Sequence, residues 1–409
     1  MLKFFKIYLA NGTGIMLLYL FSVVALGSFV IGPLSVRVYA TVLMLIYILV
    51  NVKRFKATSV VPISKSYIKL YVAFLLIFFV CLVITGDLMN YGFFKRFLAY
   101  DLVCITTFFA IYLKVNNKDQ FKCILYFLLI LCLFNSCITL LQITGQDIGW
   151  TIGQYIAPVD EAKDIADTHE GLLAISFAPG IFSHVVSNAF ILASFSPLAL
   201  FLSKRKGIVM FILMTCIYLV VIFLTQQRAA FYLYLLSLII SLFALVVKKP
   251  RILILMVLII CSLGTQLIDF FIGFDFGRLA SGQDDSRFFM FKYAMEFIPK
   301  HFLFGGVSEF TRVTKLSAHN IILDSFIFAG IGGFITLMLF NIKVGLLCAK
   351  NTLSFVKGKC SLMTFSLTMA MTTCTLYGFT HNTSVLTGDV VVFILLALLL
   401  KSIKIDKIL

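Results

Sequence analysis

The chain has 409 residues, of which 61% are hydrophobic and only 13% are charged, and its mean hydropathy is +1.06. A soluble domain carries charge on about a quarter of its residues, so this composition excludes an ordinary soluble protein. In a soluble chain the formal net charge of +16 would suggest a nucleic-acid partner. Here the positions of the charges decide what that excess means.

Apolar runs long enough to cross a bilayer recur along the whole chain. A transmembrane helix needs about 20 such residues, with roughly 17 to 25 tolerated, and the sequence contains about twelve runs of that kind. We therefore predict an all-α, polytopic membrane protein forming one membrane domain over residues 1–409. The predicted spans are 14–31, 34–52, 68–85, 97–113, 123–143, 181–202, 208–224, 229–247, 252–268, 320–341, 361–379 and 386–402.

Lysine and arginine predict the orientation of these spans. They fill every second connection, beginning with Lys3 and Lys6 and ending with Lys401, Lys404 and Lys407. Short loops rich in these residues stay cytoplasmic, so both termini are expected on the cytoplasmic side of the membrane. Most acidic residues fall on the other side. The positive net charge then reflects topology, and no nucleic-acid partner is needed.

Two predicted outward segments are long, 144–180 and 269–319. In the first, the acidic cluster of residues 160–170 fits a solvated helix better than a metal site, because it lacks a ligand-loop pattern. In the second, an amphipathic helix is predicted from Arg287 to Pro299, with a plain loop as the alternative. Its expected apolar face consists of Phe288, Phe291, Ala294, Met295 and Ile298.

Arg228 and Arg287 are the two candidate anion-binding arginines. Arg228 lies in a very tight outward hairpin, Thr225-Gln226-Gln227-Arg228. A guanidinium at that depth needs an anion, and its planar fork suits phosphate; the alternative is snorkelling to lipid headgroups. Arg287 follows Asp284-Asp285-Ser286, so an ordinary surface ion pair is its alternative reading.

His319 is the candidate base. It directly precedes the predicted span that begins at Asn320, where a helix offers free N–H groups and a positive dipole. A neutral imidazole there could take a proton from a sugar hydroxyl; a cap or packing role is the alternative. Asp324 lies about 140° round an ideal helix from His319, so it is poorly placed to orient the ring, whereas Asn320 and Asp324 share a face.

Three acidic residues, Asp101, Asp324 and Asp389, fall within about one turn of the outward ends of their predicted spans. Carboxylates inside a membrane are usually functional or paired, but simple hydration is an equal alternative at this depth. His381-Asn382, in another outward turn, repeats the His-Asn pair and is interpreted mainly as loop polarity.

In its second half the chain resembles the O-antigen polymerase and ligase family, the Wzy-type membrane glycosyltransferases. The resemblance rests on the order and outward placement of several short pieces, while the first half matches only in hydropathy. These pieces are Thr225 to Ala229, Ser286-Arg287, Ala294 to Pro299, Gly305-Gly306, His319-Asn320, Leu323 and Gly330, together with a degraded Gly180 to His184 segment and Asn188.

The resemblance implies a GT-C-like fold and transfer of a glycan from undecaprenyl pyrophosphate to a sugar hydroxyl on the periplasmic face, without cofactor or metal. It makes His319 the general base and Arg228 and Arg287 the groups that bind the leaving pyrophosphate. Besides the lipid-linked oligosaccharide and membrane lipids, a chain-length regulator is a candidate partner. The remaining candidate substrate-binding residues are Asn320, Gln227, Arg278, Lys292, Arg312 and Asp324.

Polymerase is the preferred function, because the chain looks like one of the diverse, Phe-rich members expected when every polymer has its own sugars. A ligase that passes finished glycan to lipid A core differs only in the acceptor and is the second hypothesis. The third, a lipid-linked oligosaccharide flippase, would favour charges lining both membrane halves. The acids within the predicted spans instead cluster at the outward ends.

Overall fold

The computed structural model describes residues 13–51, 62–115, 117–157, 163–164, 177–182, 184–203, 207–247, 249, 251–252, 254–255, 285–315, 317–381 and 386–406. Within these ranges the regular structure is helical except for one small hairpin, in which strand β1 (Val30–Ile31) pairs antiparallel with β2 (Leu34–Ser35). The all-α prediction is confirmed.

The helices of the first half are α2 (Thr13–Val24), α3 (Val36–Val50), α5 (Pro62–Ile84), α6 (Leu88–Tyr91), α7 (Phe93–Arg96), the π-helical turn η1 (Phe97–Asp101), α8 (Leu102–Lys114), α9 (Lys118–Ile143) and α10 (Asp147–Ile156). Those of the second half are α13 (Val185–Phe195), the 3-10 helix η2 (Ser196–Leu202), α14 (Ile208–Leu224), α15 (Arg228–Val246), α17 (Asp285–Phe297), α18 (Val307–Thr314), α19 (Ile321–Val356), α20 (Leu362–Thr380) and α21 (Val390–Asp406).

Six helical stretches are long and apolar enough to cross a membrane, which makes the chain a multi-pass membrane protein. Five further predicted spans coincide with α2, α3, α14, α20 and α21. Of these, α20 is rich in threonine and the others have 17 residues or fewer, so the total of twelve crossings stays a prediction. Nearly all of the predicted span 252–268 lies outside the described residues.

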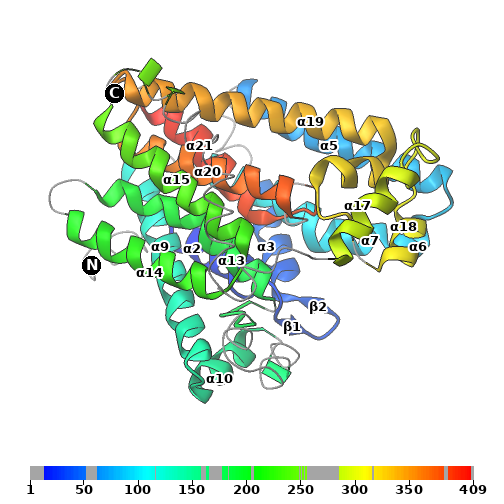
Figure 1. The fold of residues 1–409 in the computed structure, drawn as a ribbon, viewed down its shortest axis with the longest axis horizontal. Helices are drawn as coiled ribbons and strands as arrows, with labels where there is room; N and C mark the ends of the chain where they lie inside the picture. The colour runs from blue at the N-terminus through cyan, green and yellow to red at the C-terminus, as the bar shows by residue number, and fades with distance from the viewer. Residues whose placement is uncertain are drawn as a thin grey trace.

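The core of the bundle lies around α21. Every residue from Val391 to Leu400 is buried, as expected for a helix that is apolar on all faces. Helices α8 and α20 pack against α21, and α20 also packs against α15 and α19. The long helix α19 runs beside α5, and the pair forms one edge of the molecule (Figure 1).

Helices α6, α7, α17 and α18 gather at one end of the molecule, at the right of Figure 1, and we call this group the cap. Helix α21 ends at the opposite side. Both predicted outward segments contain helices: α10 lies in 144–180, and α17 and α18 lie in 269–319. The cap is therefore assembled from two chain regions about 200 residues apart.

Helix α17 confirms the helix predicted from Arg287 to Pro299, but the predicted apolar face was right only at Ala294 and wrong at Phe291 and Met295, while the side chain of Phe288 lies outside the described residues. The buried residues are Met290, Ala294 and Phe297, whereas Phe291 is 38% exposed and Met295 65% exposed. The cause is the contact with α18, where the ring of Phe297 meets that of Phe310 at a centroid distance of 5.4 Å. Packing against a neighbouring helix, which periodicity alone does not reveal, rotated the buried face.

Helix α19 is broken at Ala329 and Gly330, although the sequence predicted one uninterrupted span over 320–341. Gly330 has φ 56° and ψ −156°, a conformation open essentially to glycine alone. The loop 302–306 fills the break: Gly306 N–H donates to Ile327 O at 2.9 Å, and Ile331 N–H donates to Phe302 O at 2.8 Å. The loop thus satisfies backbone groups near the interruption.

Candidate functional site

The turn that leads into α19 holds His319 in a left-handed backbone conformation, with φ 55°. Asn320 is the N-cap of the helix, and its side-chain oxygen accepts hydrogen bonds from Ile322 N at 2.8 Å and Leu323 N at 3.4 Å. The amide nitrogen of the same side chain donates to Phe379 O, at 2.8 Å. Asn320 therefore caps α19 and ties it to the end of α20.

Asp324 holds the same turn from within the first turn of α19. Its Oδ1 accepts a hydrogen bond from Ala318 N at 2.8 Å, and its Oδ2 accepts one from Asn320 N at 3.3 Å. These two bonds flank His319. Asp324 thus fixes the backbone on both sides of the histidine, in keeping with the prediction that it shares a face with Asn320.

His381 is the partner that sequence reasoning did not select. Its ring lies 5.1 Å from that of His319, centroid to centroid, in an edge-to-face arrangement, and it is 6% exposed. The ring of Tyr377 lies 5.5 Å from that of His381, centroid to centroid. The only signal in the sequence was the repeated His-Asn pair in two outward turns. Folding brings the two histidines together because α19 packs against α20.

Arg228 is the first residue of α15, and α14 ends at Leu224. The hairpin predicted between these two helices is therefore present. The hairpin is tight: Gln226 has φ 54° and is buried, and the side chain of Gln227 donates to Thr225 O at 3.4 Å. Arg228 is half-buried and close enough to Tyr232 for an electrostatic effect. Helix α15 packs against α20, and His381 is the C-cap residue of α20.

The other predicted site residues lie apart from this turn. Lys292 is exposed on α17, and Arg312 lines a cavity in the cap. Arg287 belongs to α17, but its side chain lies outside the described residues, as does all of Arg278. The folded chain brings together His319, Asn320 and Asp324, whereas the described contacts do not join Arg228, Gln227 or Lys292 to them.

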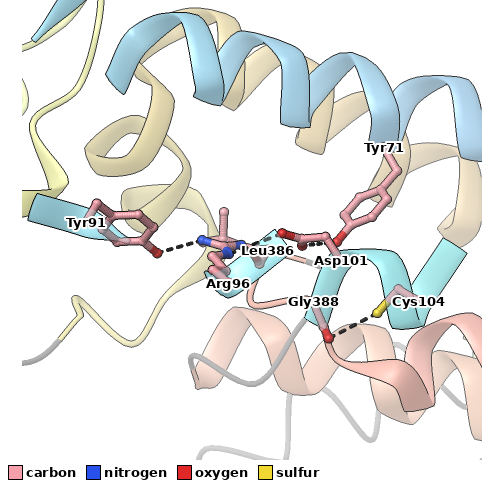
Figure 2. Close-up of polar contacts among 7 residues, drawn as sticks. All are labelled: Tyr71, Tyr91, Arg96, Asp101, Cys104, Leu386 and Gly388. Carbon is pink, nitrogen blue, oxygen red and sulfur yellow. Dashed lines mark hydrogen bonds and ion pairs between the residues drawn. The ribbon is translucent and has the colours of Figure 1, made fainter. Parts of the chain in front are cut away.

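A buried charge network lies where α5, α6, α7, η1, α8 and the turn before α21 meet (Figure 2). Arg96 Nε lies 3.5 Å from Asp101 Oδ2, and their side chains are 11% and 0% exposed. Tyr71 Oη donates to Asp101 Oδ1 at 2.6 Å. Arg96 also donates to Tyr91 Oη at 2.7 Å and to the carbonyl oxygen of Leu386.

A local departure from α-helical geometry makes this ion pair possible. Residues five apart lie about 140° from each other on an ideal α-helix, so Arg96 and Asp101 would not face one another. The π-helical turn η1 between them has i→i+5 hydrogen bonding, which places residues five apart on one side. The guanidinium further lies 5.1 Å from the ring centre of Phe78 and 5.3 Å from that of Phe328.

The three acidic residues predicted near the outward ends of spans all have partners in the protein. Asp101 pairs with Arg96, Asp324 binds backbone N–H groups, and Asp389 Oδ1 accepts from Val391 N at 2.9 Å at the start of α21. Asp101 and Asp324 are 0% and 1% exposed. Simple hydration is therefore the wrong interpretation for both. Sequence reasoning selected Asp101 but not Arg96.

The cap contains a cavity of about 830 Å³, within the range of about 300 to 1,000 Å³ found for small-molecule sites. One wall is the segment from Thr85 to Tyr91, and the other runs from His301 to Arg312. Tyr91 belongs both to this wall and to the buried network around Arg96.

No protein-family model matches this chain, and no curated protein matches it. The resemblance to the polymerase and ligase family therefore stays a prediction that rests on the short sequence pieces quoted above.

Proposed function

We propose that the protein is a polysaccharide polymerase of the bacterial inner membrane. It transfers an undecaprenyl-pyrophosphate-linked glycan to a sugar hydroxyl of another lipid-linked repeat unit on the periplasmic face. The observation that carries this proposal is the turn at the start of α19, where His319 has an unfavourable backbone conformation and lies beside His381. Strained residues persist only where the surroundings hold them, and they concentrate at functional sites.

His319 acts as the general base in this mechanism. It takes the proton of the acceptor hydroxyl while the hydroxyl oxygen attacks the anomeric carbon of the donor sugar. The bond from that carbon to the pyrophosphate oxygen breaks, and its electron pair leaves with the pyrophosphate. A positioned base typically contributes about 10² to 10⁴ in rate. The hydrogen bonds of Asn320 and Asp324 place the imidazole in advance.

Arg228 and Arg287 meet the charge that grows on the leaving pyrophosphate. Arg228 opens α15, whose first intrahelical hydrogen bond runs from Phe231 N to Gln227 O at 3.0 Å. The N–H groups before it have no partner within the helix and carry the positive end of the dipole. The guanidinium and the helix end therefore attract the same anion, which supports a role in binding pyrophosphate.

The orientation of the protein is supported by the lysines at the end opposite the cap. Lys114 ends α8 next to Tyr112, whose carbonyl accepts a hydrogen bond from Lys401 at 3.0 Å. Lys357 and Lys359 follow α19, close to Ser361, whose N–H donates to Asp406 at 3.0 Å. Lysine-rich ends stay in the cytoplasm, so the cap and the His319 turn are assigned to the periplasm.

The decisive experiment deletes the gene in its source bacterium and complements it with wild type, His319→Ala or Lys300→Ala. Lys300 is an exposed residue between α17 and α18, and it belongs neither to the turn nor to the lining of the cavity. On a lipopolysaccharide gel, wild type and Lys300→Ala should restore the long ladder. His319→Ala, confirmed to be inserted, should leave core plus one repeat unit.

Two other outcomes would overturn the polymerase assignment. Loss of all O-antigen from the core, with polymer accumulating on the lipid carrier, would mean a ligase. An unchanged ladder in the deletion strain would remove the protein from this process altogether.

A further inference from the structure

The cap cavity is lined mostly by groups that form hydrogen bonds. Thr85, Asn90, Tyr91, Ser308 and Thr311 contribute hydroxyl and amide side chains from both walls. The lining thus offers both hydrogen-bond donors and acceptors to a ligand that carries hydroxyl groups of its own.

The charges of the lining disfavour an anion. Asp87 and Glu309 provide two carboxylates against the one guanidinium of Arg312, which leaves a formal charge of −1 with His301 neutral. The sequence placed Arg312 among residues for an anionic substrate. In the folded chain it faces the same cavity as two acids, and this balance suits a neutral or amino-bearing ligand better than pyrophosphate.

His301, which lines the cavity, belongs to an aromatic stack. The ring of His301 stacks on Phe297 with centroids 4.0 Å apart and an interplanar angle of 15°, and His301 Nε2 lies 3.6 Å from Glu309 Oε2. Gly306 lies against this stack, where an added Cβ would come within 3.0 Å of Phe297. The absence of a side chain at Gly306 therefore lets the stack approach the backbone.

The cavity wall is anchored to the helix that carries the candidate base. Gly306 donates its N–H to Ile327 O, and at Gly305, with φ 72°, an added Cβ would lie 2.6 Å from the same oxygen. Ile327 precedes the break in α19, eight residues after His319. A ligand held in the cavity is thus positioned by the same short helical segment as the imidazole.

We infer that this cavity is a saccharide-binding subsite, which holds neutral or amino sugars of the glycan away from the reacting hydroxyl. Hydroxyl, amide and carboxylate side chains next to an aromatic stack offer the alternating donors and acceptors that sugar hydroxyls require. The inference rests on the proposed function for the identity of its ligand. His319 is not among the residues that line the cavity, so the subsite can be tested separately from the base.

The test uses two threonines of the same helix, α18. Thr311 lines the cavity and Thr314 does not, and each hydroxyl donates to the carbonyl four residues earlier, at 2.8 Å. The probe is the repeat-unit oligosaccharide released by mild acid from the lipid carrier of the source bacterium. Its binding to the full-length protein in nanodiscs is measured by isothermal titration calorimetry.

Thr311→Val should weaken binding about fivefold, the loss expected for one ordinary hydrogen bond, and Thr314→Val should leave it unchanged. Asn90→Ala, on the opposite wall, should weaken binding to a similar extent and guards against a local effect on α18. His319→Ala should bind the sugar normally while losing transfer. Wild-type affinity in Thr311→Val and Asn90→Ala, or no binding by wild type, would overturn the inference.

The two proposals fail in distinguishable ways. If the deletion strain keeps its ladder while Thr311→Val and Asn90→Ala weaken binding, the polymerase assignment is wrong and the saccharide subsite stands. If the ladder depends on His319 while both variants bind normally, the subsite is wrong and the polymerase assignment stands.

Discussion

The turn at His319 and the network at Arg96 are two polar regions in an otherwise apolar chain, and they differ in how they are held. Arg96 and Asp101 are nearly inaccessible and are surrounded by hydrogen bonds and aromatic rings. His319 is half-buried and kept in a left-handed conformation by bonds to its neighbours. A buried ion pair that is closely enclosed by its neighbours secures the packing of helices, whereas a partly accessible side chain on a fixed backbone is available for chemistry.

Replacing His319 should produce the largest effect on activity. His319→Ala should lower the transfer rate about 10² to 10⁴-fold with little change in the thermal unfolding midpoint, because the side chain is only half-buried. The rate is measured with purified protein in nanodiscs, from the growth of polymer on lipid-linked repeat units. His381→Phe keeps an aromatic ring against His319 and should retain most of the rate. A His319→Ala rate close to wild type would refute the base assignment.

Replacing Arg96 should affect stability most. Arg96→Ala leaves the carboxylate of Asp101 buried without its cation, which should lower the free energy of unfolding by about 3 to 5 kcal/mol. Substituting both residues, Arg96→Met with Asp101→Leu, removes the uncompensated charge and should recover most of that loss. Denaturation in detergent micelles measures both effects. If the double variant were less stable than Arg96→Ala, the hydrogen bonds of the network would contribute to the free energy of unfolding beyond the neutralisation of the two charges.

Sequence reasoning succeeded where the determinant is local. The predicted span 208–224 coincides with α14, because its apolar run is bounded by Gly207 and the Thr225 hairpin. Asn320 and Asp324 were placed on one face of a helix from spacing alone, and both bond to the turn of His319.

Features that depend on tertiary contacts were not predictable in this way. His381 is 62 positions from His319 and reaches it only through the packing of α19 on α20. The π-helical turn that aligns Arg96 with Asp101 leaves no mark in hydrophobic periodicity. The break in α19 depends on contacts with the loop 302–306. The sequence around Gly330 alone therefore gives no indication that the helix is interrupted there.

Substitutions at two glycines of α19 compare the break in the helix with a regular part of the same helix. At Gly330 an added Cβ would collide with Leu303 O, and φ is 56°, so Gly330→Ala should cost roughly 3 kcal/mol of stability. At Gly345, in the same helix, an added Cβ would have no described neighbour within 4 Å, and Gly345→Ala should stabilise the protein by about 1 kcal/mol. Thermal unfolding of both variants is the measurement. Equal effects would mean that loop 302–306 does not hold the break.

The smallest effects are expected at Asn320. Two substitutions there distinguish its contribution to stability from its contribution to the placement of His319. Asn320→Ala removes the N-cap of α19 and should cost about 1 kcal/mol. Asn320→Asp keeps an N-cap acceptor but loses the hydrogen bond donated to Phe379 O, the link between α19 and the end of α20. It should therefore unfold near the wild-type temperature and still transfer glycan more slowly. If Asn320→Asp kept the full rate, the link to α20 would have no part in placing His319 beside His381, and the turn at Asp324 alone would position the base.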